Sequence, residues 1–208
     1  MTRRRAGVDY GRMPATNTYC YCQGLKSAMS NPNQLEQFSA SYDATQDRLL
    51  LRVRTTDDAE FRFWLTRRYL ELLWPILMKI ADTFTSRKAP DNPQARSVMA
   101  EMAHGQAVGA ANFSTQYQKG SLFPLGEEPI LLARISVKAK EGNTQTLTLL
   151  PQEGQGLHLE LDEKLVHVLA RLLQEAAIGA EWGLKLQVVT GGGNALESPA
   201  AGAQRLLH

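Results

Sequence analysis

The chain contains 208 residues with a formal net charge of +2, and 43% of them are hydrophobic and 21% charged. These values are ordinary for a globular protein and allow one domain or two small ones. No run of about 18 apolar residues is present, which excludes a membrane-spanning helix. The basic N-terminus is not followed by the apolar stretch of a secretory signal. We therefore expect a cytoplasmic protein without a membrane partner.

Residues 1–34 are rich in Arg, Gly, Asn, Pro and Ser and show no clear hydrophobic period. We predict a flexible basic arm there, beginning with Arg3, Arg4 and Arg5. The only cysteines, Cys20 and Cys22, stand one residue apart. A disulfide across so short a loop would be strained, and a zinc site would need another spacing and further ligands. We interpret the pair as ordinary thiols and expect neither a metal nor another cofactor.

Residues 35–90 are predicted to form a strand–strand–strand–helix unit. Apolar and polar residues alternate within 38–42, 49–53 and 61–65, and short polar turns separate these runs, which indicates antiparallel strands. Thr66 is a suitable N-cap for the following helix. Helical spacing predicts that the buried face of this helix comprises Tyr69, Leu72, Leu73, Ile76, Leu77, Ile80 and Phe84.

A connecting helix and loop are predicted over residues 91–128. Asn92 is a suitable cap and Pro93 suits the first helical position, so we expect a helix from there to about Phe113. Residues 129–190 then repeat the first pattern, with strands over 135–139, 147–149 and 157–161. Asp162 caps a second long helix, and a last strand is predicted over 184–188. The tail, residues 191–208, lacks bulky core residues and is predicted to be disordered.

A shift of 96 residues superposes the two units. It places the strand 61–65 on 157–161 and the cap Thr66 on Asp162. The shared pattern of strand, cap and helix predicts an α+β fold made of two tandem antiparallel units, which favours internal duplication. The alternative is that any strand leading into a helix has such a pattern.

The outward face of the first unit has an unusual composition. If the apolar residues of 49–53 and 61–65 pack under the helix, the other face presents Arg48, Leu50, Arg52, Arg54, Arg62 and Trp64. Arginines at alternate positions beside an exposed tryptophan suit phosphate contacts and base stacking. Alternatively, the second unit or a second copy covers this face, and Arg52 and Arg62 pair with carboxylates.

Arg67 and Arg68 fall in the first turn of a helix, where the helix dipole disfavours cations. Either a phosphate or an acidic partner compensates them, or they form a solvated pair of little energetic consequence. The matching outer face of the second unit carries ordinary polar side chains such as His158 and Glu160. We expect this unit to be a scaffold or a dimerisation surface.

The sequence contains no recognisable catalytic set. Neither His104 nor His158 has a neighbouring Asp, Cys or Ser at the spacing of a nucleophile and its base. The glycines at 191–193 follow a predicted strand, but no helix opens after them, so a phosphate-binding loop is not indicated. We therefore predict that the protein is not an enzyme; an enzyme with dispersed residues would show a deep pocket around His158 or His104.

Two functions remain after these exclusions. The first is the binding of single-stranded nucleic acid by a homo-oligomer, with Arg48, Arg52, Arg54, Arg62, Arg67 and Arg68 on phosphates and Trp64 stacking on bases. Repeated strand–strand–strand–helix units resemble, in architecture alone, the PUR and Whirly families of single-strand binders. The second is a structural or adaptor protein that assembles with itself or docks on a larger complex, because Trp and Arg are enriched at interface hot spots.

Overall fold

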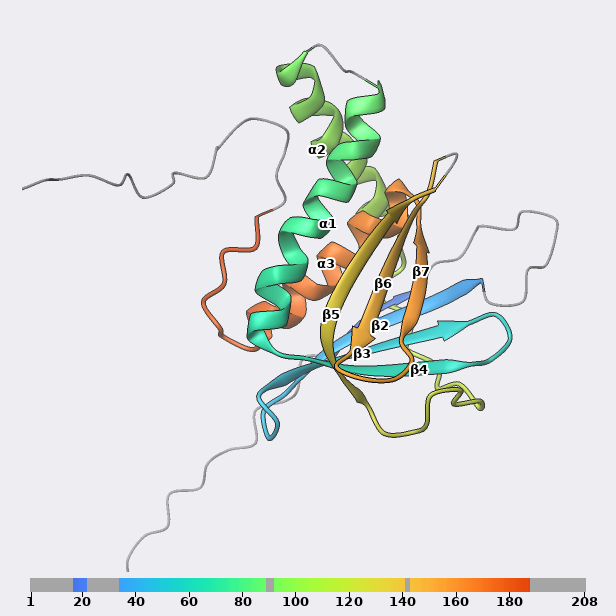
Figure 1. Cartoon of the computed structure of the whole chain (residues 1–208). Helices are drawn as coiled ribbons and strands as arrows, with labels where there is room; N and C mark the ends of the chain where they lie inside the picture. Colours follow the sequence, from blue (N-terminus) through green and yellow to red (C-terminus); the bar gives the residue numbers. More distant parts are fainter. Residues whose placement is uncertain (1–16, 22–33, 89–91, 141–142, 188–208) are drawn as a thin grey trace, which may run out of the picture.

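The computed structural model describes residues 17–21, 34–88, 92–140 and 143–187 (Figure 1). It contains the strands β1 (Asn17–Tyr21), β2 (Leu35–Asp43), β3 (Arg48–Thr55), β4 (Glu60–Leu65), β5 (Ile130–Ala139), β6 (Gln145–Pro151) and β7 (Leu157–Leu161). The helices are α1 (Arg67–Lys88), α2 (Pro93–Ala110) and α3 (Glu163–Gly179). The predicted α+β class is confirmed, and the order strand–strand–strand–helix occurs as β2–β4 with α1 and as β5–β7 with α3.

The strands form one mixed sheet in the order β1-β2-β3-β4-β5-β6-β7. Pairing is antiparallel throughout, as the short turns predict, except where β4 meets β5. These two strands run parallel, and within the described residues they pair only through Phe63 with Ile130 and Trp64 with Leu131. In Figure 1, β5–β7 run steeply upward and β3 and β4 run across the view, so the two groups diverge beyond this short junction.

Side-chain caps start the helices where the sequence predicts them. The backbone N–H of Tyr69 donates to Thr66 Oγ1 at 3.1 Å, and that of Leu165 donates to Asp162 Oδ1 at 2.7 Å. Asn92 accepts from the N–H of Ala95 in the same way. Because each cap satisfies an otherwise unpaired helix N–H, polar residues at these positions determine where the helices begin.

The two strand groups share one hydrophobic core. Besides α2, α3 packs against β2 and β1 more than against β7, and α1 contacts β5, so each helix contacts strands of the other group. The buried apolar residues of both groups form a single cluster. Polar contacts also join the groups: Trp182 Nε1 donates to Asp47 Oδ1 at 2.8 Å, and Lys88 Nζ lies 2.5 Å from Glu163 Oε2. Whether the two groups arose by duplication stays a prediction.

Three sequence-based expectations are wrong. Residues 17–21, assigned to the flexible arm, form β1 beside β2; the rest of residues 1–34 lies outside the described residues, apart from Gln34. Leu72, predicted to be buried, is 55% exposed, because α1 turns Leu70 and Trp74 inward, where they join the common core. The last strand, predicted over 184–188, is absent from the described residues 184–187. Side chains hold this segment instead: Trp74 donates to the Gln187 carbonyl and Gln174 to that of Leu186.

A histidine pair, of which His167 is buried and His104 half-buried, joins α2 to α3. His167 on α3 is 1% exposed, and its Nδ1 lies 3.4 Å from Nδ1 of His104 on α2. Burial, the neighbouring His104 and the charge of Lys88 together lower the pKa of His167 from 6.5 to about 4. Glu163 opposes this shift but does not reverse it. Both imidazoles are therefore neutral at neutral pH, since burial and Arg171 also lower the pKa of His104.

This depressed pKa predicts an acid-sensitive fold. An unfolded His167 binds a proton near pH 6.5, whereas the folded one does so only near pH 4. The stabilisation is therefore complete above pH 6.5 and is lost progressively as the pH falls toward 4. We expect the free energy of unfolding, measured by urea denaturation at stepped pH, to fall less steeply over this range in His167→Gln than in the unmodified chain. His158→Gln, at an exposed position, is the control, and an unchanged slope in His167→Gln would contradict the assignment.

Candidate functional site

The outer face of β2–β4 carries the arginines and the tryptophan predicted from the sequence. Arg52 on β3 stands directly opposite Arg62 on β4, and Leu50 stands opposite Trp64. Like charges directly opposite each other destabilise an antiparallel pair. The arginine pair therefore needs compensating contacts. The segment that supplies them covers one part of the face and not the other.

Residues 111–129, which connect α2 to β5 and which we call the strap, cross this face. The strap is bound to the β3–β4 turn by backbone hydrogen bonds: Glu60 N–H donates to the Leu122 carbonyl at 2.8 Å, and Leu122 N–H donates to that of Asp58 at 3.2 Å. Gly120 permits this approach, because a Cβ there would lie 2.7 Å from the Asp58 carbonyl oxygen. The strap is thus joined to the sheet by its main chain.

Glu60 links the strap to the arginines. Its side chain is fully buried, with Oε1 2.6 Å from Arg62 Nε and Oε2 accepting from the Gly120 N–H at 2.7 Å. A buried carboxylate is costly unless it is paired and hydrogen-bonded, and both oxygens meet that condition here. Arg62 also donates to the Glu127 carbonyl, which holds a second point of the strap.

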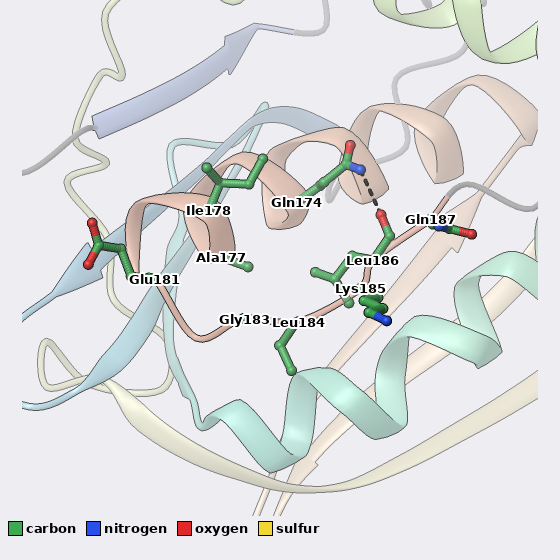
Figure 2. Close-up of a pocket in the computed structure, with 9 residues that line it drawn as sticks. All are labelled: Gln174, Ala177, Ile178, Glu181, Gly183, Leu184, Lys185, Leu186 and Gln187. Carbon is green, nitrogen blue, oxygen red and sulfur yellow. Dashed lines mark hydrogen bonds between the residues drawn. The ribbon is translucent and has the colours of Figure 1, made fainter.

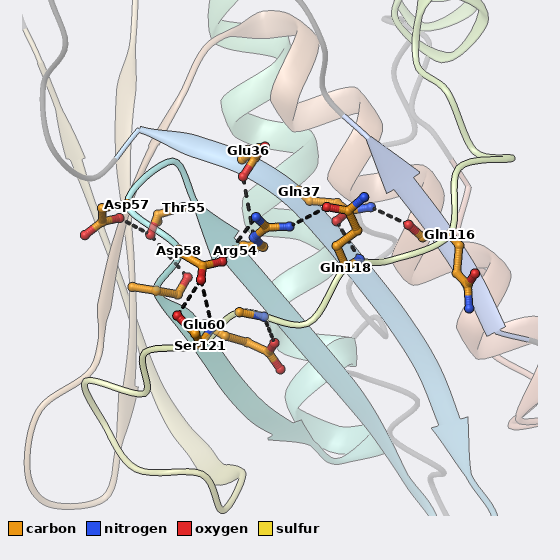
Figure 3. Close-up of polar contacts among 12 residues, drawn as sticks. Glu36, Gln37, Arg54, Thr55, Asp57, Asp58, Glu60, Gln116, Gln118 and Ser121 are labelled. Carbon is orange, nitrogen blue, oxygen red and sulfur yellow. Dashed lines mark hydrogen bonds and ion pairs between the residues drawn. The ribbon is translucent and has the colours of Figure 1, made fainter.

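Arg54 occupies the centre of a second polar network (Figure 3). Its guanidinium lies 3.5 Å from Glu36 and 3.1 Å from Asp58, and it donates to Gln118 Oε1 of the strap at 3.1 Å. Ser121 donates to Asp58 through both its N–H and its hydroxyl. These bonds, and the charge of Arg54, lower the pKa of Asp58. Arg54 is therefore neutralised within the chain.

Aromatic side chains of the strap cover the other two arginines. Arg52 lies 4.3 Å from the ring centre of Tyr117 and donates to Ser39 Oγ at 3.0 Å, and Arg62 lies 4.6 Å from the ring centre of Phe123. Such cation–π contacts are worth about 0.5–2 kcal/mol, more where water is excluded. Burial raises the pKa of the Tyr117 hydroxyl, as expected under a closed strap.

The remaining predicted residues lie at the opposite end of the face, where β4 leads into α1. Trp64 is half-buried between Leu50 on β3 and Leu131 on β5, and Leu131 is 43% exposed. Arg67 forms an exposed ion pair with Glu71. Arg48 and Arg68 form no ion pair with any residue that the structure describes. The structure thus separates Arg52, Arg54 and Arg62, under the strap, from Arg48, Trp64, Arg67 and Arg68.

Sequence reasoning placed residues 91–128 between the units and gave them no role at the site. The signal that could have identified the strap is Glu60, an acidic residue beside Arg62 in a strand whose outer face is otherwise basic and aromatic. Together with Tyr117 and Phe123 in a segment without hydrophobic period, it indicates that a neighbouring loop is held there.

Neither of two pockets lined by described residues contains a recognisable catalytic set. The larger of the two, of about 470 Å³, lies between the end of α3 and residues 183–187 (Figure 2). Its titratable residues, Glu181 and Lys185, lie at opposite ends of the group that Figure 2 draws. His158 bonds Thr148 on the neighbouring strand, and His104 faces His167. Among the described residues no cluster of His, Cys, Asp and Glu could hold a metal ion, and no helix has the length and apolar character to cross a membrane.

The comparisons with known proteins return nothing: no protein family, no curated protein and no solved structure matches this chain.

The position of Glu60 predicts a large contribution to stability. Glu60→Ala removes the partner of Arg62 and the acceptor for the Gly120 N–H, and deleting one member of a buried ion pair costs about 3–5 kcal/mol. Since Arg62 can turn partly toward solvent, we expect the free energy of unfolding, measured by urea denaturation, to fall by about 3 kcal/mol. Glu71→Ala, which breaks only the exposed pair with Arg67, should cost less than about 1 kcal/mol. Similar losses in both variants would contradict the described geometry.

Proposed function

We propose that the chain is a non-enzymatic protein-binding module that assembles with a second copy of itself through the open part of the β2–β4 face. The observation that carries this proposal is the apolar row Leu50–Trp64–Leu131, which crosses three adjacent strands and to which no described hydrogen bond or ring contact of the strap extends. A half-exposed tryptophan between two leucines suits the centre of a protein interface.

The charge distribution favours a protein partner over a polyanion on this face. Arg52, Arg54 and Arg62 lie among Glu36, Asp58 and Glu60, all of which belong to β2, β4 or the turn before β4. The strap supplies none of these carboxylates, so Arg54 and Arg62 keep their acidic partners if the strap moves, whereas Arg52 loses the Tyr117 ring. Desolvating arginines that are paired in this way costs less than desolvating a row of unpaired cations.

The binding of single-stranded nucleic acid is the second candidate. It is favoured by Arg48 and Arg68, which have no ionic partner in the described part of the chain and belong to the β3 start and α1 start beside Trp64. Two cations and one stacking ring form a small site for an oligonucleotide. The arginines 3–5, which lie outside the described residues, would add non-specific attraction.

We also propose that the two strand groups descend from one duplicated unit. The order of three antiparallel strands and a helix recurs, and the helix caps Thr66 and Asp162 stand 162 − 66 = 96 residues apart, the same offset that relates β4 to β7. The exchange of helix contacts between the groups is compatible with two copies of one unit that share a core.

Sedimentation velocity over a range of concentrations tests the assembly proposal. We expect the unmodified chain to sediment as a dimer at high concentration. Trp64→Ser should raise the dissociation constant at least about tenfold, because a central tryptophan typically contributes 2 kcal/mol or more. Leu72→Ser changes an exposed apolar residue on α1 and should leave the dimer intact. A chain that stays monomeric at every concentration would reject self-assembly.

Fluorescence anisotropy of labelled single-stranded DNA and RNA at two salt concentrations tests the second candidate. If the open row binds nucleic acid, the double variant Arg48→Ala, Arg68→Ala should weaken binding and reduce its salt dependence, with a change in slope of about 0.7 for each lost phosphate contact. Lys79→Ala, on an exposed position of α1, should bind as the unmodified chain does. Absence of binding at low salt would eliminate this candidate.

A further inference from the structure

The outer edge of β5 is unpaired over most of its length. β5 has ten residues, but in the described chain only Ile130 and Leu131 pair with β4, because β4 ends at Leu65 and leads into α1. From Leu132 onward β6 is the single strand neighbour. In Figure 1, β5 forms the border of the β5–β7 group. An open edge of this kind presents backbone N–H and C=O groups to which a further strand can bond.

The pairing near Pro151 shows which backbone groups face this edge. β6 ends at Pro151, which has no N–H, so the pairing of Arg134 with Leu150 is of the type in which the two residues exchange both N–H···O bonds. The backbone of Arg134 therefore faces β6, and the hydroxyl of Tyr69 on α1 is a second donor to the same carbonyl, at 3.2 Å. Alternate residues share one direction and no register shift intervenes after Arg134, so the N–H and C=O of Ile135, Val137 and Ala139 face outward.

The side chains at this edge define the chemistry of a partner strand. Ser136, Lys138 and Ala139 are exposed, and Val137, on the side of the core, is 38% exposed. Arg134 and Lys138 lie on the opposite side of the sheet from Ile135 and Val137, because side chains alternate along a strand. Lys138 forms no ion pair within the described residues. The complementary strand is acidic on one face and apolar on the other.

This charge pattern disfavours a second copy of β5 as the occupant. Antiparallel self-pairing centred on Ser136 would place Arg134 of one copy opposite Lys138 of the other, twice. Like charges directly opposite each other are destabilising. An alternating acidic and apolar segment would instead form two cross-strand ion pairs and cover Val137.

We propose that the β5 edge, residues 134–139, binds an extended acidic segment of another protein as an added antiparallel strand. Main-chain hydrogen bonds to Val137 and Ala139 supply the binding, and Arg134 and Lys138 select acidic side chains at alternate positions. This surface does not include Leu50 or Trp64, so the inference does not rest on the proposed self-assembly.

Anisotropy of two labelled heptapeptides with the full chain tests the proposal. One peptide alternates glutamate and valine, and the other alternates lysine and valine. We expect the glutamate peptide to bind at least about tenfold more tightly, since two cross-strand ion pairs replace two repulsive ones. Trp64→Ser should bind the glutamate peptide as the unmodified chain does. Equal affinity for the two peptides, or no binding of either, would overturn the proposal.

Two variants locate the binding at the edge. Val137→Pro removes an outward N–H without removing a bond to β6, a place where an edge strand tolerates proline. We expect it to abolish binding, and Val137→Ala to retain it. Should Val137→Pro lose its circular dichroism signal, Lys138→Glu decides, because it should reduce or reverse the preference for the glutamate peptide. Binding that persists in folded Val137→Pro, or a preference unchanged by Lys138→Glu, would contradict the proposal.

Discussion

The buried carboxylate of Glu60 is the constraint on which the functional face depends. At 0% exposure it must be paired, and its two oxygens bind Arg62 on its own strand and the Gly120 N–H of the strap. One side chain thereby resolves the repulsion between facing arginines and fixes where the strap crosses the sheet. The strap then brings Tyr117 and Phe123 over the arginines.

The position of the strap determines which part of the face is open to a partner. It covers the arginines near the β3–β4 turn, and its described hydrogen bonds and ring contacts do not extend to the row around Trp64, at the point where β4 meets β5. The same junction ends the pairing of β5, so the open row and the open edge adjoin at Leu131. Two surfaces of different chemistry, one apolar and one basic, therefore arise from the divergence of the two strand groups.

Local patterns predicted most of the elements but not their assembly. Period-two alternation and the caps at Thr66 and Asp162 depend on neighbouring residues, so β3, β4, β7 and the helix starts follow from sequence. The burial of Leu70 in place of Leu72, and the strap over Arg52, depend on contacts between distant segments that no local period contains. The segment 184–187 has a strand pattern but no strand beside it to pair with. β1 was missed because its five residues show no clear alternation.

Hydrogen exchange of single backbone amides, followed by NMR in the full-length chain, tests the closed strap most directly. The amides of Gly120 and Leu122 donate to Glu60 and to the Asp58 carbonyl, so the account predicts protection comparable to that of the β4 amides. Exchange at the rate of an exposed loop would contradict it. The arginines of the face would then be available to a ligand, and the division into a covered and an open part would not hold.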